Sequence, residues 1–168
     1  KLKQELYRKL VAYIVENQEK FYRLAFSYLK NQEDALDVVQ NAICKALEHY
    51  SELKSEAALK TWFYRIVLNE SIIFYNKRKR EILTQDGEWI ERPYEEKGFD
   101  IHDDLYARIG RMEETAQKII KLRFFEELTL EEIAQVLEMN VNTVKAKLYR
   151  GLKALRIAEG EEEEAWTV

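Results

Sequence analysis

The first 86 residues of the chain contain neither glycine nor proline. These two residues interrupt helices most strongly, because glycine costs backbone entropy and proline lacks an N–H donor. The same stretch is rich in Leu, Ala, Glu and Lys, which favour helices. The sequence therefore predicts that the N-terminal half of the protein is entirely helical.

Three helices are expected in this half, because apolar residues recur at intervals of three and four. The first is one long amphipathic helix over residues 6–28, which Asn31 closes. The second covers residues 35–47 and the third runs from about residue 59 to residue 77. A polar loop, residues 50–58, joins the second helix to the third.

Some side chains of these helices are expected to be buried. In the third helix they are Trp62, Phe63, Ile66, Val67, Ile73 and Phe74. Cys44 lies among apolar residues of the second helix and is expected to be a buried structural thiol. One cysteine and two histidines are too few for a disulfide framework or a structural zinc site. We therefore expect no metal and no cofactor.

Residues 81–104 differ in character from the rest of the chain. They contain two of the five glycines, the only proline, and nine acidic residues against one arginine and one lysine. Such a composition predicts a flexible linker. We therefore expect an all-α protein of two small helical domains, residues 1–80 and 105–158, joined by an acidic linker and followed by an acidic tail at residues 159–168.

The composition also bears on the location of the protein. Hydrophobic residues make up 46% of the chain and charged residues 35%, as in soluble globular proteins. No apolar run approaches the roughly 20 residues that a membrane span needs. The N-terminal residues lack the apolar core of a signal peptide. We expect a cytoplasmic protein that does not insert into a membrane.

The net charge of −4 argues by itself against nucleic-acid binding, but the charges are unevenly distributed. One basic run consists of Lys77, Arg78, Lys79 and Arg80. A second basic stripe consists of Lys145, Lys147, Arg150, Lys153 and Arg156. The distribution of charge matters more than its sum when a binding face is sought, so both stripes are candidate DNA contacts.

The second basic stripe belongs to a predicted helix-turn-helix. Thr129 and Glu132 have the spacing of a capping box at the start of the first helix. After a turn at residues 138–140, Asn140 is suited to be the N-cap of the second helix. The inner face of that helix is formed by Val144, Leu148, Leu152 and Leu155. The second helix is expected to enter the major groove of DNA; the alternative is a pair of packed helices with a solvated basic face.

Residues 130–134, Leu130-Glu131-Glu132-Ile133-Ala134, and residues 142–156 resemble the C-terminal domain of sigma factors, which recognises the minus-thirty-five promoter element. A response-regulator output domain carries a similar helix-turn-helix, so this half alone leaves both families open. The resemblance to sigma factors implies DNA contacts from Asn142, Thr143, Lys145, Ala146, Lys147, Tyr149 and Arg150.

Residues 34–41 resemble the sigma segment that docks on the clamp helices of the polymerase beta-prime subunit. The family usually has Glu at the third position of this segment, where this chain has Leu36. The alternative interpretation is a solvated polar stripe. The resemblance implies contacts with core polymerase from Asp34, Asp37, Val38, Gln40 and Asn41.

Residues 59–69 and 76–80 are similar to the sigma segment that melts and recognises the minus-ten element. A melted strand needs cations for its phosphates and pockets for its unstacked bases. In this family the loop before the third helix forms the pocket, which corresponds to residues 50–60 here. We expect Asn69 near the flipped base and Trp62 in the core. The resemblance implies minus-ten contacts from Lys60, Thr61, Arg65, Asn69, Lys77, Arg78, Lys79 and Arg80.

The order of these segments, without the intermediate domain of larger sigma factors, is typical of the extracytoplasmic-function (group 4) sigma factors. The resemblance implies a protein that catalyses nothing itself and carries core RNA polymerase to promoter DNA, bound to the beta-prime clamp helices and the beta flap. It also implies an anti-sigma factor, often membrane-anchored, and a role in stress responses. The main alternative is a dimeric helix-turn-helix transcriptional regulator with a helical sensor domain. A helical adaptor leaves the basic stripes unexplained, and the histidines and cysteine form no catalytic constellation.

Overall fold

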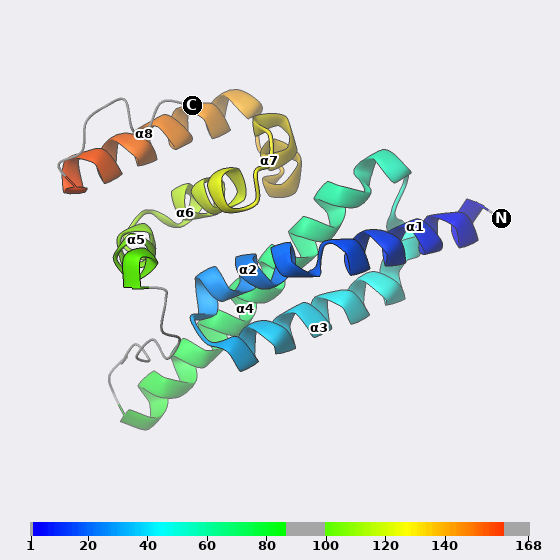
Figure 1. Ribbon diagram of the computed structural model, residues 1–168, viewed down its shortest axis with the longest axis horizontal. Helices are drawn as coiled ribbons and strands as arrows, with labels where there is room; N and C mark the ends of the chain where they lie inside the picture. Colours follow the sequence, from blue (N-terminus) through cyan, green and yellow to red (C-terminus); the bar gives the residue numbers. More distant parts are fainter. Residues whose placement is uncertain (1, 87–99, 160–168) are drawn as a thin grey trace. The chain divides into compact units, whose positions relative to one another are not determined.

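The computed structural model describes the backbone of residues 2–86 and 100–159, and the side chains of residues 2–83 and 105–156. Within these ranges the regular elements are all helical and no strand occurs (Figure 1). The chain divides into two compact units, Lys1–Glu95 and Glu96–Val168. The predicted fold class, all-α with two small helical domains, is confirmed.

The described part of the N-terminal unit contains four α-helices and two short 3-10 turns. They are α1 (Leu2–Glu16), α2 (Gln18–Leu29), α3 (Gln32–His49), η1 (Tyr50–Glu52), η2 (Glu56–Ala58) and α4 (Leu59–Asp86). Helices α2, α3 and α4 pack against one another (Figure 1). The turn η1 contacts α1. The core of this unit therefore lies between α2, α3 and α4.

Aromatic rings fill the centre of this core. Phe21 of α2 is fully buried, and its ring centroid lies 4.6 Å from that of Phe63 and 5.1 Å from that of Tyr64, both on α4. Both ring pairs are edge-to-face, which adds about 0.5–1.5 kcal/mol each beyond the burial of the rings. Small residues of α3, Ala35, Ala42 and Ala46, are fully buried and let the helices approach closely.

The prediction of a single helix over residues 6–28 is wrong, because the helix is interrupted at Asn17. The side-chain amide of Asn17 donates to the backbone carbonyl of Tyr13 at 2.8 Å. Asn side chains compete with the backbone for hydrogen bonds, which favours a break in the helix. The end predicted at Asn31 is also different: Lys30 ends α2 in a left-handed conformation (φ 51°), and Asn31 caps the start of α3.

Helix α4 extends to Asp86, beyond the predicted end of the third helix, and α5 begins at Asp100. Helical backbone therefore occupies both ends of the stretch predicted to be an acidic linker. The remainder of that stretch, residues 87–99, lies outside the described residues, as does most of the predicted acidic tail, residues 160–168.

The described part of the C-terminal unit consists of four α-helices and one π-helical turn. They are α5 (Asp100–Gly110), α6 (Glu114–Ile120), η3 (Lys121–Phe125), α7 (Leu130–Leu137) and α8 (Val141–Glu159). Both α6 and α7 pack against α8. The predicted inner face of α8 is confirmed, since Val144, Leu148, Leu152 and Leu155 are each at most 2% exposed.

The predicted helix-turn-helix has the predicted local chemistry. Thr129 Oγ1 accepts the backbone N–H of Glu132 at 3.1 Å, and Glu132 Oε1 accepts the N–H of Thr129 at 2.9 Å, which completes the capping box. Glu138 ends α7 in a left-handed conformation (φ 55°). Asn140 Oδ1 then accepts the N–H of Asn142 at 2.8 Å. Asn140 thus satisfies one of the first N–H groups of α8, as an N-cap residue does.

Two predictions of burial are wrong. Ile73 is 57% exposed, and Cys44 is exposed as well. In α4 apolar residues occur on every side of the helix, so their number alone does not reveal which face meets α2 and α3. In α3 the buried side is occupied by Ala42 and Ala46, which leaves Cys44 facing outward.

No helix in the described ranges is long and apolar enough to cross a membrane.

Candidate nucleic-acid interface

The outer face of α8 carries the residues expected to contact the minus-thirty-five element. Tyr149 is 50% exposed. Also exposed are Asn142, Thr143, Lys145, Ala146 and Arg150. Because the opposite face of α8 is buried against α6 and α7, these side chains share one accessible surface. The structure therefore brings six of the seven predicted residues together.

The seventh residue, Lys147, lies at the edge of that surface and is half-buried. It is close to Glu113, the N-cap of α6. The pKa of Glu113 is lowered mainly because its carboxylate accepts the backbone N–H of Ala116, at 2.9 Å, and to a smaller extent by the charge of Lys147. Lys147 is thus placed beside an acidic side chain of its own unit.

A second candidate surface runs along α4. Trp62, Ile66, Asn69 and Ile73 follow one another at spacings of four, three and four, so they share one helical face. Trp62 and Ile66 are half-buried, whereas Asn69 and Ile73 are exposed. Asn69 was predicted to contact DNA, whereas the three apolar residues were predicted to lie in the core. The spacing of these three residues in the sequence could have predicted that they share a helical face with Asn69.

The remaining residues predicted to contact the minus-ten element differ in accessibility. Lys60 and Arg65 are half-buried. Thr61 is only 6% exposed, and its hydroxyl donates to the carbonyl of Ala58 at 3.3 Å. Thr61 therefore fastens the preceding loop to the start of α4 and has little surface to offer to DNA.

The four residues of the basic run near the end of α4 also differ in accessibility. Lys77, Lys79 and Arg80 are exposed. Arg78 instead turns toward α3, where its Nη1 donates to Asp34 Oδ2 at 2.7 Å. The side chains of this pair are only 24% and 12% exposed. Arg78 and Asp34 were predicted to contact different partners, but the structure pairs them with each other.

The face of α3 expected to dock on polymerase is partly accessible. Asp37, Gln40 and Asn41 are exposed, and so is Leu36, at 50%. Val38 is only 1% exposed, so its side chain belongs to the core. The side chain of Val38 therefore cannot make the polymerase contact that the resemblance implies. Asp34 is largely occupied by its pairing with Arg78.

Ion pairs join α3 to α4. Besides Arg78 and Asp34, Lys45 Nζ lies 2.6 Å from Glu70 Oε2. Asp34 precedes Lys45 on α3, whereas its partner on α4 follows the partner of Lys45. This order is expected for antiparallel neighbours. The exposed face of α3 and the exposed face of α4 therefore belong to one body with a fixed register.

The chain matches two protein-family models. Residues 13–81 match Sigma-70 region 2, and residues 102–155 match Sigma-70, region 4. The first match contains the accessible faces of α3 and α4, and the second contains the helix-turn-helix. A dimeric regulator with a helical sensor domain, the main alternative, does not explain the match over residues 13–81.

Curated relatives resemble the chain over most of its length. The RNA polymerase sigma factor SigV of Bacillus subtilis is 44% identical over 160 residues, which cover 94% of this chain and 95% of the relative. The ECF RNA polymerase sigma factor SigW of the same species is 26% identical, and the alignment covers 82% of each chain.

Solved structures share the fold. The sigma factor RpoE of Bartonella quintana, crystallised with the anti-sigma factor NepR, superimposes with a TM-score of 0.69 at 23% sequence identity. The match covers 96% of this chain and 98% of that chain. With both sigma regions matched in order and 44% identity to a sigma factor of equal extent, the chain belongs to the extracytoplasmic-function family of RNA polymerase sigma factors.

Proposed function

We propose that the chain binds core RNA polymerase through the exposed face of α3, opens the minus-ten element with α4 and the loop before it, and recognises the minus-thirty-five element with α8. The observation that carries this proposal is that both matched sigma regions keep an accessible polar or basic face while their opposite faces are buried. In this role the protein is an initiation factor that works in the cytoplasm and has no catalytic activity of its own.

The chemistry of α4 supports the minus-ten assignment. A melted strand binds where aromatic and apolar side chains meet its bases and cations meet its phosphates. Trp62, Ile66 and Ile73 flank Asn69 on one face of α4, and the exposed cations Lys77 and Arg80 follow on the same helix. Asn69 offers both a donor and an acceptor to a base edge.

The chemistry of α8 supports the minus-thirty-five assignment. A helix in the major groove distinguishes base pairs through hydrogen bonds to their edges, most often from Arg or Lys to guanine. Lys145 and Arg150 are exposed on the outer face, with Tyr149 between them in sequence. We propose that Lys145 and Arg150 contact bases, and that Lys147, at the edge, contacts phosphate.

We further propose that an anti-sigma factor controls this protein. The Bartonella quintana relative of the same fold was crystallised with an anti-sigma factor. A face that binds core polymerase is a suitable target for such a partner, since covering it prevents assembly with the enzyme. In this chain Leu36, 50% exposed near Asp37 and Gln40, adds an apolar side chain to that face.

Run-off transcription tests the proposal. Purified chain is added to bacterial core polymerase on a library of promoters, and binding to core is measured in parallel. We expect Arg150→Glu to reduce promoter-specific transcription by at least tenfold, because it removes a base contact worth about 1–3 kcal/mol and introduces repulsion from phosphate. Core binding should remain unchanged.

The matched control is Arg111→Glu, the same charge reversal at an exposed residue of the C-terminal unit outside the α8 face. It should transcribe like the wild-type protein. If Arg150→Glu lost core binding, the assignment of the two units would be refuted. If the wild-type chain failed to associate with core polymerase, the proposed function itself would be refuted.

A further inference from the structure

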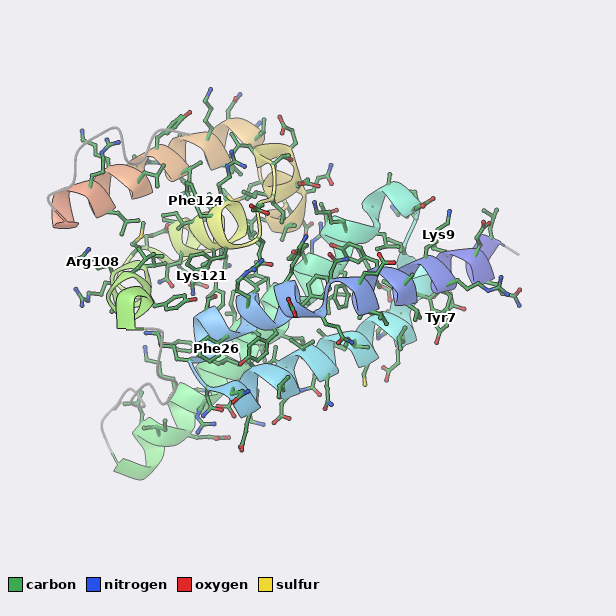
Figure 2. All side chains as sticks on the ribbon, in the orientation of Figure 1. Tyr7, Lys9, Phe26, Arg108, Lys121 and Phe124 are labelled. Carbon is green, nitrogen blue, oxygen red and sulfur yellow. The ribbon has the colours of Figure 1, made fainter. Side chains whose placement is uncertain are left out.

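Helix α1 contacts the loop that joins α3 to α4. The ring of Tyr7 packs edge-to-face on Tyr50, with ring centroids 5.1 Å apart. Two residues later, Lys9 Nζ lies 2.8 Å from Glu56 Oε2. Both α1 side chains are labelled in Figure 2. The match to Sigma-70 region 2 begins at residue 13, so both contacts come from residues that precede the matched region.

The loop itself, residues 50–58, has few internal constraints. Its two 3-10 turns are closed by short-range backbone bonds: the Leu53 N–H donates to Tyr50 O at 3.0 Å, the Ala58 N–H donates to Ser55 O at 3.2 Å, and the Leu59 N–H donates to Glu56 O. Leu53 anchors the loop in the core at 5% exposure, but residues 54–57 are exposed. Contacts from α1 therefore hold the loop at both turns, through Tyr50 of η1 and Glu56 of η2.

We propose that Tyr7 and Lys9 are positioning residues that fix the loop of residues 50–58 and thereby set which base it accepts at the minus-ten element. This inference rests on the proposed function, in which the loop takes part in opening the minus-ten element. Neither residue is required to touch DNA, because each acts through the loop residue that it holds.

The physical reason is preorganisation. Taking a base out of the stack is costly, so a pocket that must also order itself binds the base less well and discriminates less between bases. A loop that is held in one conformation before the base arrives avoids this second cost. The hydrogen bond from Lys9 to Glu56 also raises the pKa of Lys9, in agreement with the geometry of the pair.

The two contacts are expected to differ in strength. The side chains of Lys9 and Glu56 are 44% and 62% exposed, so water screens their attraction and the pair contributes little. Tyr7 is 38% exposed, and its ring packs directly on Tyr50. This ring contact contributes more to holding the loop than the ion pair does. Removal of the ring should therefore have the larger effect.

The test uses the full chain assembled with core polymerase on promoters whose minus-ten region is randomised. The quantity measured is the ratio of transcripts from the preferred minus-ten base to those from its substitutes. A loss of folded protein lowers all transcripts equally and leaves this ratio unchanged, whereas a displaced loop lowers the ratio.

We expect Tyr7→Ala to lower the ratio about fivefold, in line with the strength of an aromatic pair. Lys9→Glu, which places a like charge against Glu56, should lower it about twofold. Tyr7→Phe and Lys9→Arg keep the ring and the charge, so both should discriminate like the wild-type protein. Lys3→Glu is the matched control, because it reverses an exposed charge on the same helix with no ion pair to the loop among those described.

The outcomes separate the inference from the function on which it rests. If the wild-type chain directs no promoter-dependent transcription, the proposed function fails. If the wild-type chain discriminates between bases but Tyr7→Ala and Lys9→Glu keep the same ratio, the inference fails even when total transcription falls. A lower ratio in Lys3→Glu as well would also overturn it, since the effect would then not depend on the loop contacts.

Discussion

At the scale of single residues, burial decides which polar side chains near a partner surface can reach that partner. Asp34 and Asp37 lie on the same helix within one turn, yet Asp37 is exposed while Asp34 is buried and accepts a hydrogen bond from Arg78. A buried charge is tolerated only when it is paired. Asp34 and Arg78 therefore stabilise the junction of α3 and α4, on which both proposed interfaces depend.

Removing Arg78 tests this assignment. We expect Arg78→Ala to lower the free energy of unfolding of the N-terminal unit by about 2 kcal/mol, because the Asp34 carboxylate stays in the core without the guanidinium. Hydrogen exchange of the α3 and α4 amides in the full chain measures this change. Lys77→Ala, at the adjacent exposed residue, should change stability by at most about 0.5 kcal/mol. Equal protection in the two variants would contradict the role of the pair.

Cys44 offers a second test at this scale. It is exposed, and it lies four residues after Gln40 and three after Asn41, on the face of α3 proposed to dock on polymerase. As the only cysteine of the chain it can be labelled selectively. We expect a maleimide that carries a polyethylene glycol chain to prevent association with core polymerase, as measured by co-elution in gel filtration. Cys44→Ser treated with the same reagent should bind; full binding by the labelled wild-type protein would place the interface elsewhere.

At the scale of elements, close approach between helices depends on small residues. Gly151 of α8 is buried against α6, and a Cβ added there would lie 2.9 Å from Met112 Cε and 3.1 Å from Ile120 Cδ1. Both atoms are ends of flexible side chains, so a single methyl group can be accommodated by small shifts. A branched side chain has no such room.

The two substitutions at Gly151 should therefore differ. Gly151→Ala is expected to be close to neutral, because the improved helix propensity of about 1 kcal/mol offsets the displacement of Met112. Gly151→Val should destabilise the C-terminal unit by about 2 kcal/mol through overpacking. Hydrogen exchange of the α8 amides distinguishes the two, and comparable loss in both variants would show that α6 and α8 cannot adjust.

The start of α6 is expected to depend on pH. The pKa of Glu113 lies below its ordinary value of 4.5, mainly because its carboxylate accepts a hydrogen bond from the Ala116 N–H. A depressed pKa in the folded state means that the ionised form contributes stability above pH 4.5, and that this stability is lost as the pH falls through the lower folded value. Glu113→Gln should be less stable than wild type near neutral pH and lose less on acidification. NMR titration of the Glu113 side chain measures its pKa directly, and a value at or above 4.5 would contradict this.

At the scale of the whole molecule, the segregation of charge matters more than the net charge of −4. The exposed cations Lys145 and Arg150 lie on α8, while residues 81–104 carry nine acidic residues. Phosphate contacts supply most of the affinity of proteins for DNA. We expect an anionic stretch within the same chain to weaken that attraction.

We therefore expect the isolated chain to bind promoter DNA weakly at physiological salt, and to bind it tightly only with core polymerase. Gel-shift titrations with and without core measure the difference. Replacing the acidic residues of 81–104 by Gln or Asn should strengthen binding of the isolated chain, because less negative charge opposes the phosphates. Tight, sequence-specific binding by the isolated wild-type chain would contradict this account.

Features that depend only on residues close together in the chain could be predicted from the sequence. The capping box of Thr129 and Glu132, the Asn140 cap and the inner face of α8 follow from local hydrogen bonds and helical periodicity, and all were predicted. The family, too, was evident from motifs in the right order. These features need no knowledge of what packs on a helix, because each is satisfied within one or two turns of the chain.

Which faces of α3 and α4 are buried depends on how these helices pack against their neighbours. Both helices carry apolar side chains on more than one side, so the assignments of Cys44 and Ile73 to the core were wrong, and Val38, which the resemblance gave as a polymerase contact, is buried. The pairing of Asp34 with Arg78 and the contacts of α1 with the loop join residues more than 40 positions apart. Such contacts depend on how helices pack against one another, and periodicity within one helix carries no information on its neighbour.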